Sequence, residues 1–172
     1  MDFFELVAYR ESIRDYNPTR PVDRATLGRI LEAGRLAPSA CNRQPWTFLV
    51  VQSPGALARV RTAYGRPWFQ DAPQVLVVVG SRSEAWVRPY DGYNALETDL
   101  TIVMDHLILA ATAEGLGTCW IAHFDPAILR PALGLSPDQE VFAITPLGYP
   151  GEGFVRKGTK TRKGLEAIVK YI

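Results

Sequence analysis

The spacing of apolar residues predicts several helices. Apolar positions recur at the i, i+3, i+4, i+7 spacing of one helical face between residues 27 and 34, and Asp23 stands where it can cap that helix. A broader apolar stripe predicts that the longest helix starts near Asn94 and stops at Gly115. Shorter helices are expected at residues 2–10, after Ser53–Pro54, after Asp125–Pro126 and around residues 164–170.

Strand-like runs alternate with these helices but do not follow a regular βαβ repeat. The run VLVVV at 75–79 is continuously apolar, which is typical of a strand buried on both faces. Further strands are expected at residues 46–52, 118–122 and 141–145. The pattern therefore predicts an α+β fold, with about four or five strands packed between helices, and a single domain over residues 1–172. Segment 81–93 is the least patterned part, and it is either a lid or a packing loop.

Composition and charge narrow the possible partners. Hydrophobic residues make up 47% of the 172 residues and the formal net charge is +1, with no basic block, so nucleic acid is not expected as a partner. The longest apolar stretch, residues 100–113, contains Asp105 and His106 and is shorter than the ~20 residues of a membrane span. Cys41 and Cys119 lie far apart without CxxC spacing, which argues against a zinc site and suits a reducing cytosol. We therefore expect a soluble, cytoplasmic protein.

The common catalytic motifs are absent. The sequence has no GxSxG, HExxH or GxxxxGK[ST] pattern, and the VVVGSRSEA run has one glycine where a dinucleotide loop needs GxGxxG. His106 lies inside the long predicted helix and suits a packing role, whereas His123 ends a predicted strand and is the more interesting candidate. Two separated histidines do not make a metal site, so no metal is expected.

Two other features remain unexplained by folding alone. The loop APSACNRQPW, residues 37–46, places side-chain amides between two prolines, which is typical of a grip on a polar ligand. At the two ends of the chain, R-E-S-I-R (10–14) and K-T-R (160–162) alternate basic residues. Basic residues and a hydroxyl that converge on one point would suit a phosphate, although each segment taken separately is more simply explained as solvated charge.

Taken together, these motifs resemble the nitroreductase family of FMN-dependent oxidoreductases. In the order of that family, the chain carries R-x-S-x-R, APSxxNxQPW, GLGTCWIAHFDP after a long helix, LGYP and a final K-x-R, from about residue 7 to residue 169. The resemblance implies a mostly antiparallel central sheet and an intertwined homodimer with its flavin sites at the interface. Glu11 departs from the family, because many relatives have another basic or a polar residue there.

The resemblance also assigns residues to the cofactor. The FMN phosphate would be held by Arg10, Ser12, Lys160 and Arg162. Arg14 would lie nearer the flavin ring. The loop residues that would line the flavin, partly from the other subunit, are Pro38, Ser39, Asn42 and Gln44. The backbone at Ala122 and His123 would approach flavin N5, where a fixed N–H dipole can polarise the hydride acceptor.

The implied reaction is ping-pong hydride transfer. NADH or NADPH gives a hydride to FMN, and a flat, electron-poor acceptor (a nitroaromatic, a quinone or a flavin) then binds in the same cleft. No side chain is assigned as acid or base. The alternatives are a flavin-binding module that stores or senses FMN without turnover, a dehalogenase-like enzyme for which segment 81–93 is short as a lid, and an α+β domain without flavin. The physiological acceptor and the choice between NADH and NADPH stay open.

Overall fold

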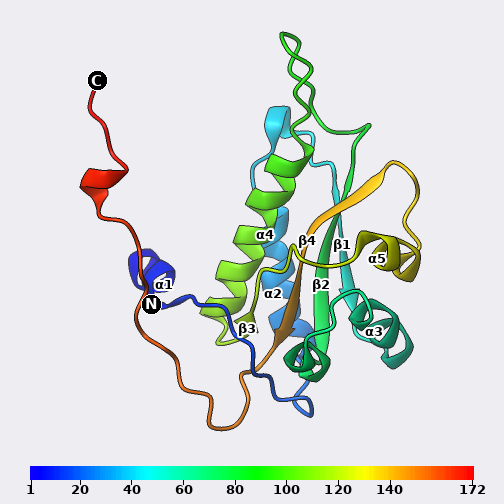
Figure 1. Cartoon of the computed structure of the whole chain (residues 1–172), viewed down its shortest axis with the longest axis vertical. Helices are drawn as coiled ribbons and strands as arrows, with labels where there is room; N and C mark the ends of the chain where they lie inside the picture. The colour runs from blue at the N-terminus through cyan, green and yellow to red at the C-terminus, as the bar shows by residue number, and fades with distance from the viewer.

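The computed structural model describes residues 1–172 and is built on one four-stranded sheet (Figure 1). The strand order is β1-β2-β4-β3, and every neighbouring pair is antiparallel. The strands are β1 (Trp46–Val51), β2 (Gln74–Ser81), β3 (Gly117–Thr118) and β4 (Gln139–Gly148). The α-helices are α1 (Phe3–Tyr9), α2 (Arg24–Arg35), α3 (Pro54–Arg61), α4 (Leu96–Ala113) and α5 (Pro126–Leu133). Short 3-10 helices lie at η1 (Ala40–Asn42), η2 (Pro67–Asp71) and η3 (Leu165–Ala167).

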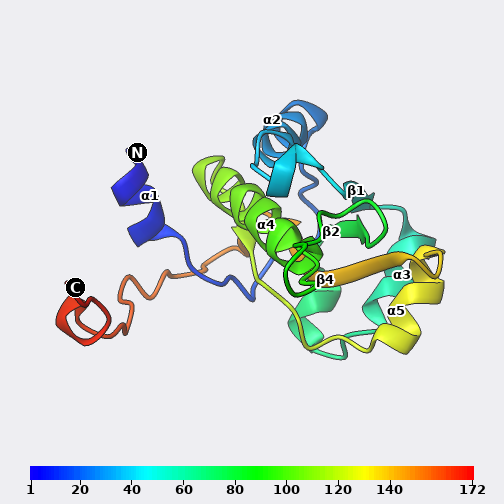
Figure 2. The ribbon, with the colours of Figure 1, turned by 90° about the horizontal axis from the view of Figure 1, so that it is seen from above.

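Helices cover both faces of the sheet. α2 and α4 pack on one face and α3 and α5 on the other, which Figure 2 shows from above. The central strand β2 is buried from Gln74 to Gly80, because it lies between two apolar layers. The predicted α+β architecture, with a mostly antiparallel sheet of about four or five strands, is therefore confirmed, and the sheet has four.

The predicted helix starts at Asp23 and Asp125 are confirmed by side-chain caps, whereas Ser53 precedes α3 without a side-chain cap hydrogen bond. The Asp23 carboxylate accepts hydrogen bonds from the Ala25 and Thr26 N–H groups at 3.0 and 2.9 Å. Asp125 accepts from Ala127 N–H at 2.8 Å, and Pro54 stands in the first turn of α3. These contacts satisfy N–H groups that a helix end leaves free.

The predicted strand at 118–122 is wrong beyond Thr118. In register, Thr118 pairs with Leu147, so Cys119 faces Pro146. Proline has no N–H, and the ladder stops there. The Cys119 N–H donates instead to the Thr145 hydroxyl at 3.1 Å, and only one isolated bridge follows, between Ile121 and Ile144.

The predicted helix at 164–170 is also wrong, because only the single turn η3 forms. Every residue from 161 to 172 is exposed, so no packing offsets the cost of starting a helix. This segment and α1 both project from the body of the molecule (Figure 2). α1 has no buried residue, and Phe4 on it is 78% exposed.

The segment that joins β2 to α4 projects beyond the first turn of α4 (Figure 1). It is closed by a bridge between Val87 and Asn94, and Tyr90 at its end is 96% exposed. None of the helices combines the length and the apolar content needed to cross a membrane.

Candidate functional site

The two ends of the chain meet at a cavity of about 400 Å³, which we call the cationic cavity. It is lined by Val7, Ala8, Arg10, Asp105, Leu109, Lys160 and Arg162. The Lys160 ammonium donates to the Val7 carbonyl, which fastens the C-terminal segment to α1. Basic residues from opposite ends of the sequence therefore line one cavity.

The charges of the cationic cavity are poorly neutralised. None of its three cations forms an ion pair, and Asp105 is the only acid in the lining. Burial lowers the pKa of Lys160, and the positive charges of Arg10 and Arg162 lower it further, against a weaker opposite effect of Glu11. An anion bound among these groups would relieve that repulsion, so the cavity has the chemistry of a phosphate site.

Glu11 belongs to a separate set of contacts. Its carboxylate lies 3.6 Å from the Arg156 guanidinium and accepts the Lys157 N–H at 3.3 Å. Arg156 also stacks on the Tyr9 ring, 3.9 Å from its centroid. These contacts hold the C-terminal segment against the end of α1, which explains an acidic residue inside a basic motif.

Segment 10–14 lies outside any helix and forms one bridge to β3, between Ser12 and Thr118. The Ile13 N–H donates to the Thr118 carbonyl at 2.8 Å, and the Ile13 side chain is buried against Gly117. The polar side chains of the segment lie beside the thiol of Cys119. Burial raises the pKa of that thiol, while Arg14, Ser12 and Arg10 act in the opposite direction. Segment 10–14 therefore leads from the cationic cavity past Cys119.

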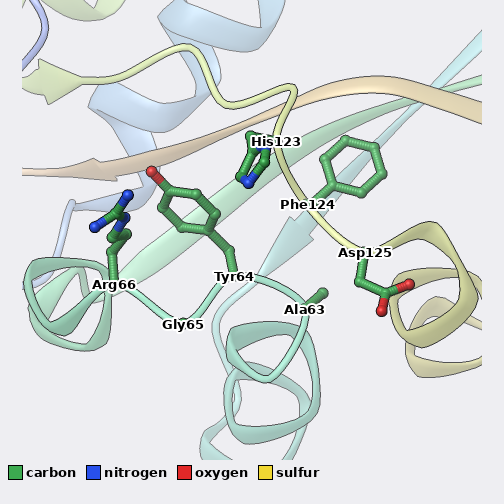
Figure 3. A pocket seen from close by; sticks show the side chains of 7 residues that line it. All are labelled: Ala63, Tyr64, Gly65, Arg66, His123, Phe124 and Asp125. Atoms are coloured by element: carbon green, nitrogen blue, oxygen red, sulfur yellow. The ribbon is translucent and has the colours of Figure 1, made fainter.

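Aromatic side chains continue from Arg14 to a second cavity. The Arg14 guanidinium lies 6.0 Å from the centroid of Trp68, and the Trp68 ring meets Tyr64 edge-on at 5.7 Å. We call the second cavity, of about 480 Å³, the Arg66 cavity (Figure 3). It is lined by Ala63, Tyr64, Gly65, Arg66, His123, Phe124 and Asp125. His123 and the preceding Ala122 are exposed.

The loop at 37–46 is strained and closed by its own hydrogen bonds. Cys41, Asn42 and Gln44 have positive φ angles of 50°, 54° and 51°, although none is glycine. The Ser39 hydroxyl accepts from the Gln44 N–H at 2.9 Å, and the Gln44 amide donates to the Asn42 backbone and side-chain oxygens, both at 3.1 Å. Pro38, Asn42 and Gln44 remain exposed.

A buried carboxylate supports this loop from α4. Asp99 is 1% exposed, and its Oδ1 accepts the Ala40 N–H at 2.9 Å. Its Oδ2 has no partner, and burial raises the pKa of the carboxyl. The loop is thus attached near the first turn of α4.

One copy of the chain does not bring all predicted site residues together. The loop contacts α4 at Asp99, whereas the cationic cavity contacts it at Asp105 and Leu109, roughly 9–15 Å further along the helix axis. The structure therefore joins Arg10, Lys160 and Arg162 and continues through Ser12 and Arg14 toward the Arg66 cavity. It leaves Pro38, Ser39, Asn42 and Gln44 apart.

The sequence patterns did not identify Tyr64, Arg66 and Trp68 as site residues. The available signal is the run RPWFQD at 66–71, whose aromatic residues lie between α3 and β2 and follow neither a helical nor a strand period. Phe69 in this run is fully buried, whereas Trp68 is half-buried and reaches the site. Because the two residues are adjacent aromatic residues in the sequence, only the folded structure shows that Phe69 packs in the core and Trp68 does not.

The fold and these groups define an α+β protein in which a cavity lined by three unpaired cations leads to an aromatic cavity. The nitroreductase family is matched over residues 7–65 and 57–149. The chain is 34% identical over 173 residues to a Thermus thermophilus protein named NADH dehydrogenase, covering 83% of this chain and 84% of the relative. The chain belongs to the nitroreductase family, as its motifs predicted.

Solved structures agree with this assignment. A nitroreductase family protein from Clostridium difficile 630 matches with a TM-score of 0.91 and 34% identity, covering 99% of this chain and 98% of the other. A structure from Exiguobacterium sibiricum 255-15 in complex with FMN shares the fold, with a TM-score of 0.85 and 22% identity over 100% of this chain and 98% of that one.

Proposed function

We propose that this protein is an FMN-dependent oxidoreductase that uses NADH or NADPH to reduce a flat, electron-poor acceptor. The observation that carries the proposal is the cationic cavity, where Arg10, Lys160 and Arg162 gather without ion-pair partners. The FMN phosphate is a dianion, so it would neutralise the unpaired positive charges of this cavity. The E. sibiricum structure, which contains FMN, supports the same choice.

The residues of one chain would hold FMN at its phosphate and beside its ring system. Arg10, Lys160 and Arg162, together with the Ser12 hydroxyl, would hold the phosphate through charge-assisted hydrogen bonds. Arg14 is displaced from the cationic cavity toward Trp68. It would place positive charge beside the ring system, where it attracts developing negative charge.

The chain's own groups would orient the ring. When bound, FMN supplies a hydride-accepting N5 and a flat face on which the nucleotide and the acceptor stack in turn. The backbone at Ala122 and His123 would donate to N5, and a fixed peptide dipole does this without reorganisation. No acidic or basic side chain is required to transfer a proton in this scheme.

The loop residues Pro38, Ser39, Asn42 and Gln44 would complete the site from a second subunit. Within one chain the loop is separate from the cationic cavity, and α1 and the C-terminal segment present apolar side chains to solvent. Burial of these ends against a second copy would remove apolar surface from water. A homodimer with its flavin sites at the interface follows from this proposal.

The test is an anaerobic absorbance spectrum of the protein with FMN, before and after addition of NADH and then NADPH. Bound flavin that bleaches with either nucleotide supports the proposal and reports the preferred nucleotide. Bound flavin that does not bleach favours a storage or sensing module. Protein that binds no FMN refutes the proposal. Sedimentation of the same sample tests the dimer.

A further inference from the structure

The Arg66 cavity contains three polar groups that the chain does not use. The Arg66 guanidinium, the Tyr64 hydroxyl and the His123 ring form no hydrogen bond, and Arg66 forms no ion pair. Figure 3 shows all three side chains in the lining of the same cavity. The Tyr64 ring also gives it a flat apolar face, and the His123 ring gives it a second flat face. Such a lining suits a ligand that combines a ring with hydrogen-bond acceptors.

The one carboxylate of the lining does not neutralise Arg66. Asp125 caps α5, where its Oδ1 accepts the Ala127 N–H at 2.8 Å. In Figure 3, Tyr64 and His123 lie between Arg66 and Asp125. No ion pair joins the two residues. The cavity therefore has a free positive charge at one end.

Two hydrogen bonds restrain the backbone on both sides of Arg66, whose side chain is exposed. The Arg66 N–H donates to the Tyr64 carbonyl at 3.0 Å, and the Arg66 carbonyl accepts the Phe69 N–H at 3.0 Å. Pro67 follows and restricts the chain further. A guanidinium on such a support can present its forked donors to a carboxylate.

The cavity also adjoins the proposed flavin site. Tyr64 contacts Trp68, which in turn lies under Arg14, the residue that leads to the cationic cavity. We infer that the Arg66 cavity selects acceptors in which a carboxylate is attached to a flat aromatic ring. The carboxylate pairs with Arg66 and the ring packs against Tyr64 and His123. This inference rests on the proposed function, because it makes the cavity's ligand the electron acceptor.

The first test uses a matched pair of ligands that are not reduced. Binding of benzoate and of benzamide to the FMN-loaded protein is measured by calorimetry without nucleotide. The two ligands have the same shape but differ in charge, so we expect benzoate to bind roughly two- to fivefold more tightly. Arg66→Ala should remove this difference, and Arg66→Lys should retain part of it. Arg59→Ala removes an exposed, unpaired arginine of α3 outside the Arg66 cavity and should change nothing.

The second test compares para-nitrobenzoate with para-nitrobenzamide as acceptors. Each nitro group takes the hydride of one NAD(P)H and one proton from solvent, which yields the nitroso compound, NAD(P)+ and one water. Arg66→Ala should raise the KM for the nitrobenzoate roughly two- to fivefold, and it should leave the KM for the nitrobenzamide and the FMN content unchanged.

The outcomes separate this inference from the proposed function. Equal benzoate and benzamide binding in the unmodified protein, with full FMN content and turnover of para-nitrobenzamide, overturns the acceptor assignment alone. An increase in the KM for NADPH but not for NADH in Arg66→Ala would assign Arg66 to the nucleotide 2′-phosphate, and also overturns it. Protein that binds no FMN overturns both.

Discussion

Replacement of Arg10 with alanine should weaken the binding of FMN much more than that of riboflavin. The Arg10 guanidinium forms no ion pair or hydrogen bond within the chain and lines the cationic cavity. Loss of one charge-assisted contact to a phosphate costs about 1.5–3 kcal/mol, which corresponds to about a ten- to hundredfold increase in Kd. Riboflavin lacks the phosphate, so its Kd should not change.

The same substitution should not destabilise the fold. Arg10 repels Lys160 and Arg162, and its positive charge lowers the pKa of Lys160. Its removal therefore relieves repulsion rather than breaking a stabilising pair, and the free energy of unfolding should stay the same or rise slightly. This separates a loss of cofactor binding from a loss of structure.

The assay is a fluorescence titration of flavin-free protein with FMN and with riboflavin, at low and high salt. The unmodified protein should prefer FMN, and high salt should reduce that preference because it screens the cationic cavity. Arg59→Ala is the control for the loss of one exposed positive charge. Equal weakening of both flavins in Arg10→Ala would show that Arg10 acts on the ring or on folding, and unchanged FMN binding would refute the phosphate assignment.

Two further predictions concern packing and buried charge. A Cβ on Gly34 would lie 2.6 Å from a Leu107 methyl, so Gly34→Ala should lower the free energy of unfolding by about 1–3 kcal/mol, whereas Gly28→Ala on the same helix meets nothing within 4 Å and should raise it by up to about 1 kcal/mol. Denaturant titration of both variants checks the pair, and equal effects would contradict the close contact of α2 with α4. Burial raises the pKa of Asp99 above the ordinary 3.8, so the native state keeps this proton to higher pH than the unfolded chain does. The contribution of Asp99 to stability should therefore fall as pH rises from about 4 through its folded pKa. Asp99→Asn, which keeps an acceptor for Ala40, should remove this trend, and a difference between the two proteins that does not vary with pH would refute it.

Local patterns predicted most of the fold because they reflect local physics. The cap at Asp23 and the continuous apolar run of β2 each determine structure within a few residues. The end of β3 could not be predicted in this way, because it depends on Pro146, which faces Cys119 across the sheet. The single turn at η3 could not be predicted for a similar reason. A longer helix there would need a packing surface that one chain does not provide.

The site was less predictable than the fold. The basic residues at the two ends were recognised as a group only through the order of the family's motifs, since alternating charge alone is also typical of a solvated segment. No sequence pattern predicted the Arg66 cavity, because Tyr64 and Arg66 lie in a connection that has neither helical nor strand periodicity. Its polar groups come together only when the segment after α3 and the segment after β3 meet in space.

The conformation of the loop at 37–46 gives the strongest physical reason to look for a second subunit. Positive φ angles at Cys41, Asn42 and Gln44 cost about 1–3 kcal/mol each, and they persist because Ser39 and Asp99 hold the loop from both sides. Within one chain the exposed side-chain amides of Asn42 and Gln44 form hydrogen bonds only within the loop. No contact of these amides with another element therefore explains the strained conformation. Strain of this kind is retained where a rigid arrangement of polar groups serves a ligand. Since the cationic cavity of the same chain is separated from the loop along α4, the proposed homodimer would let the loop contact the flavin of another copy.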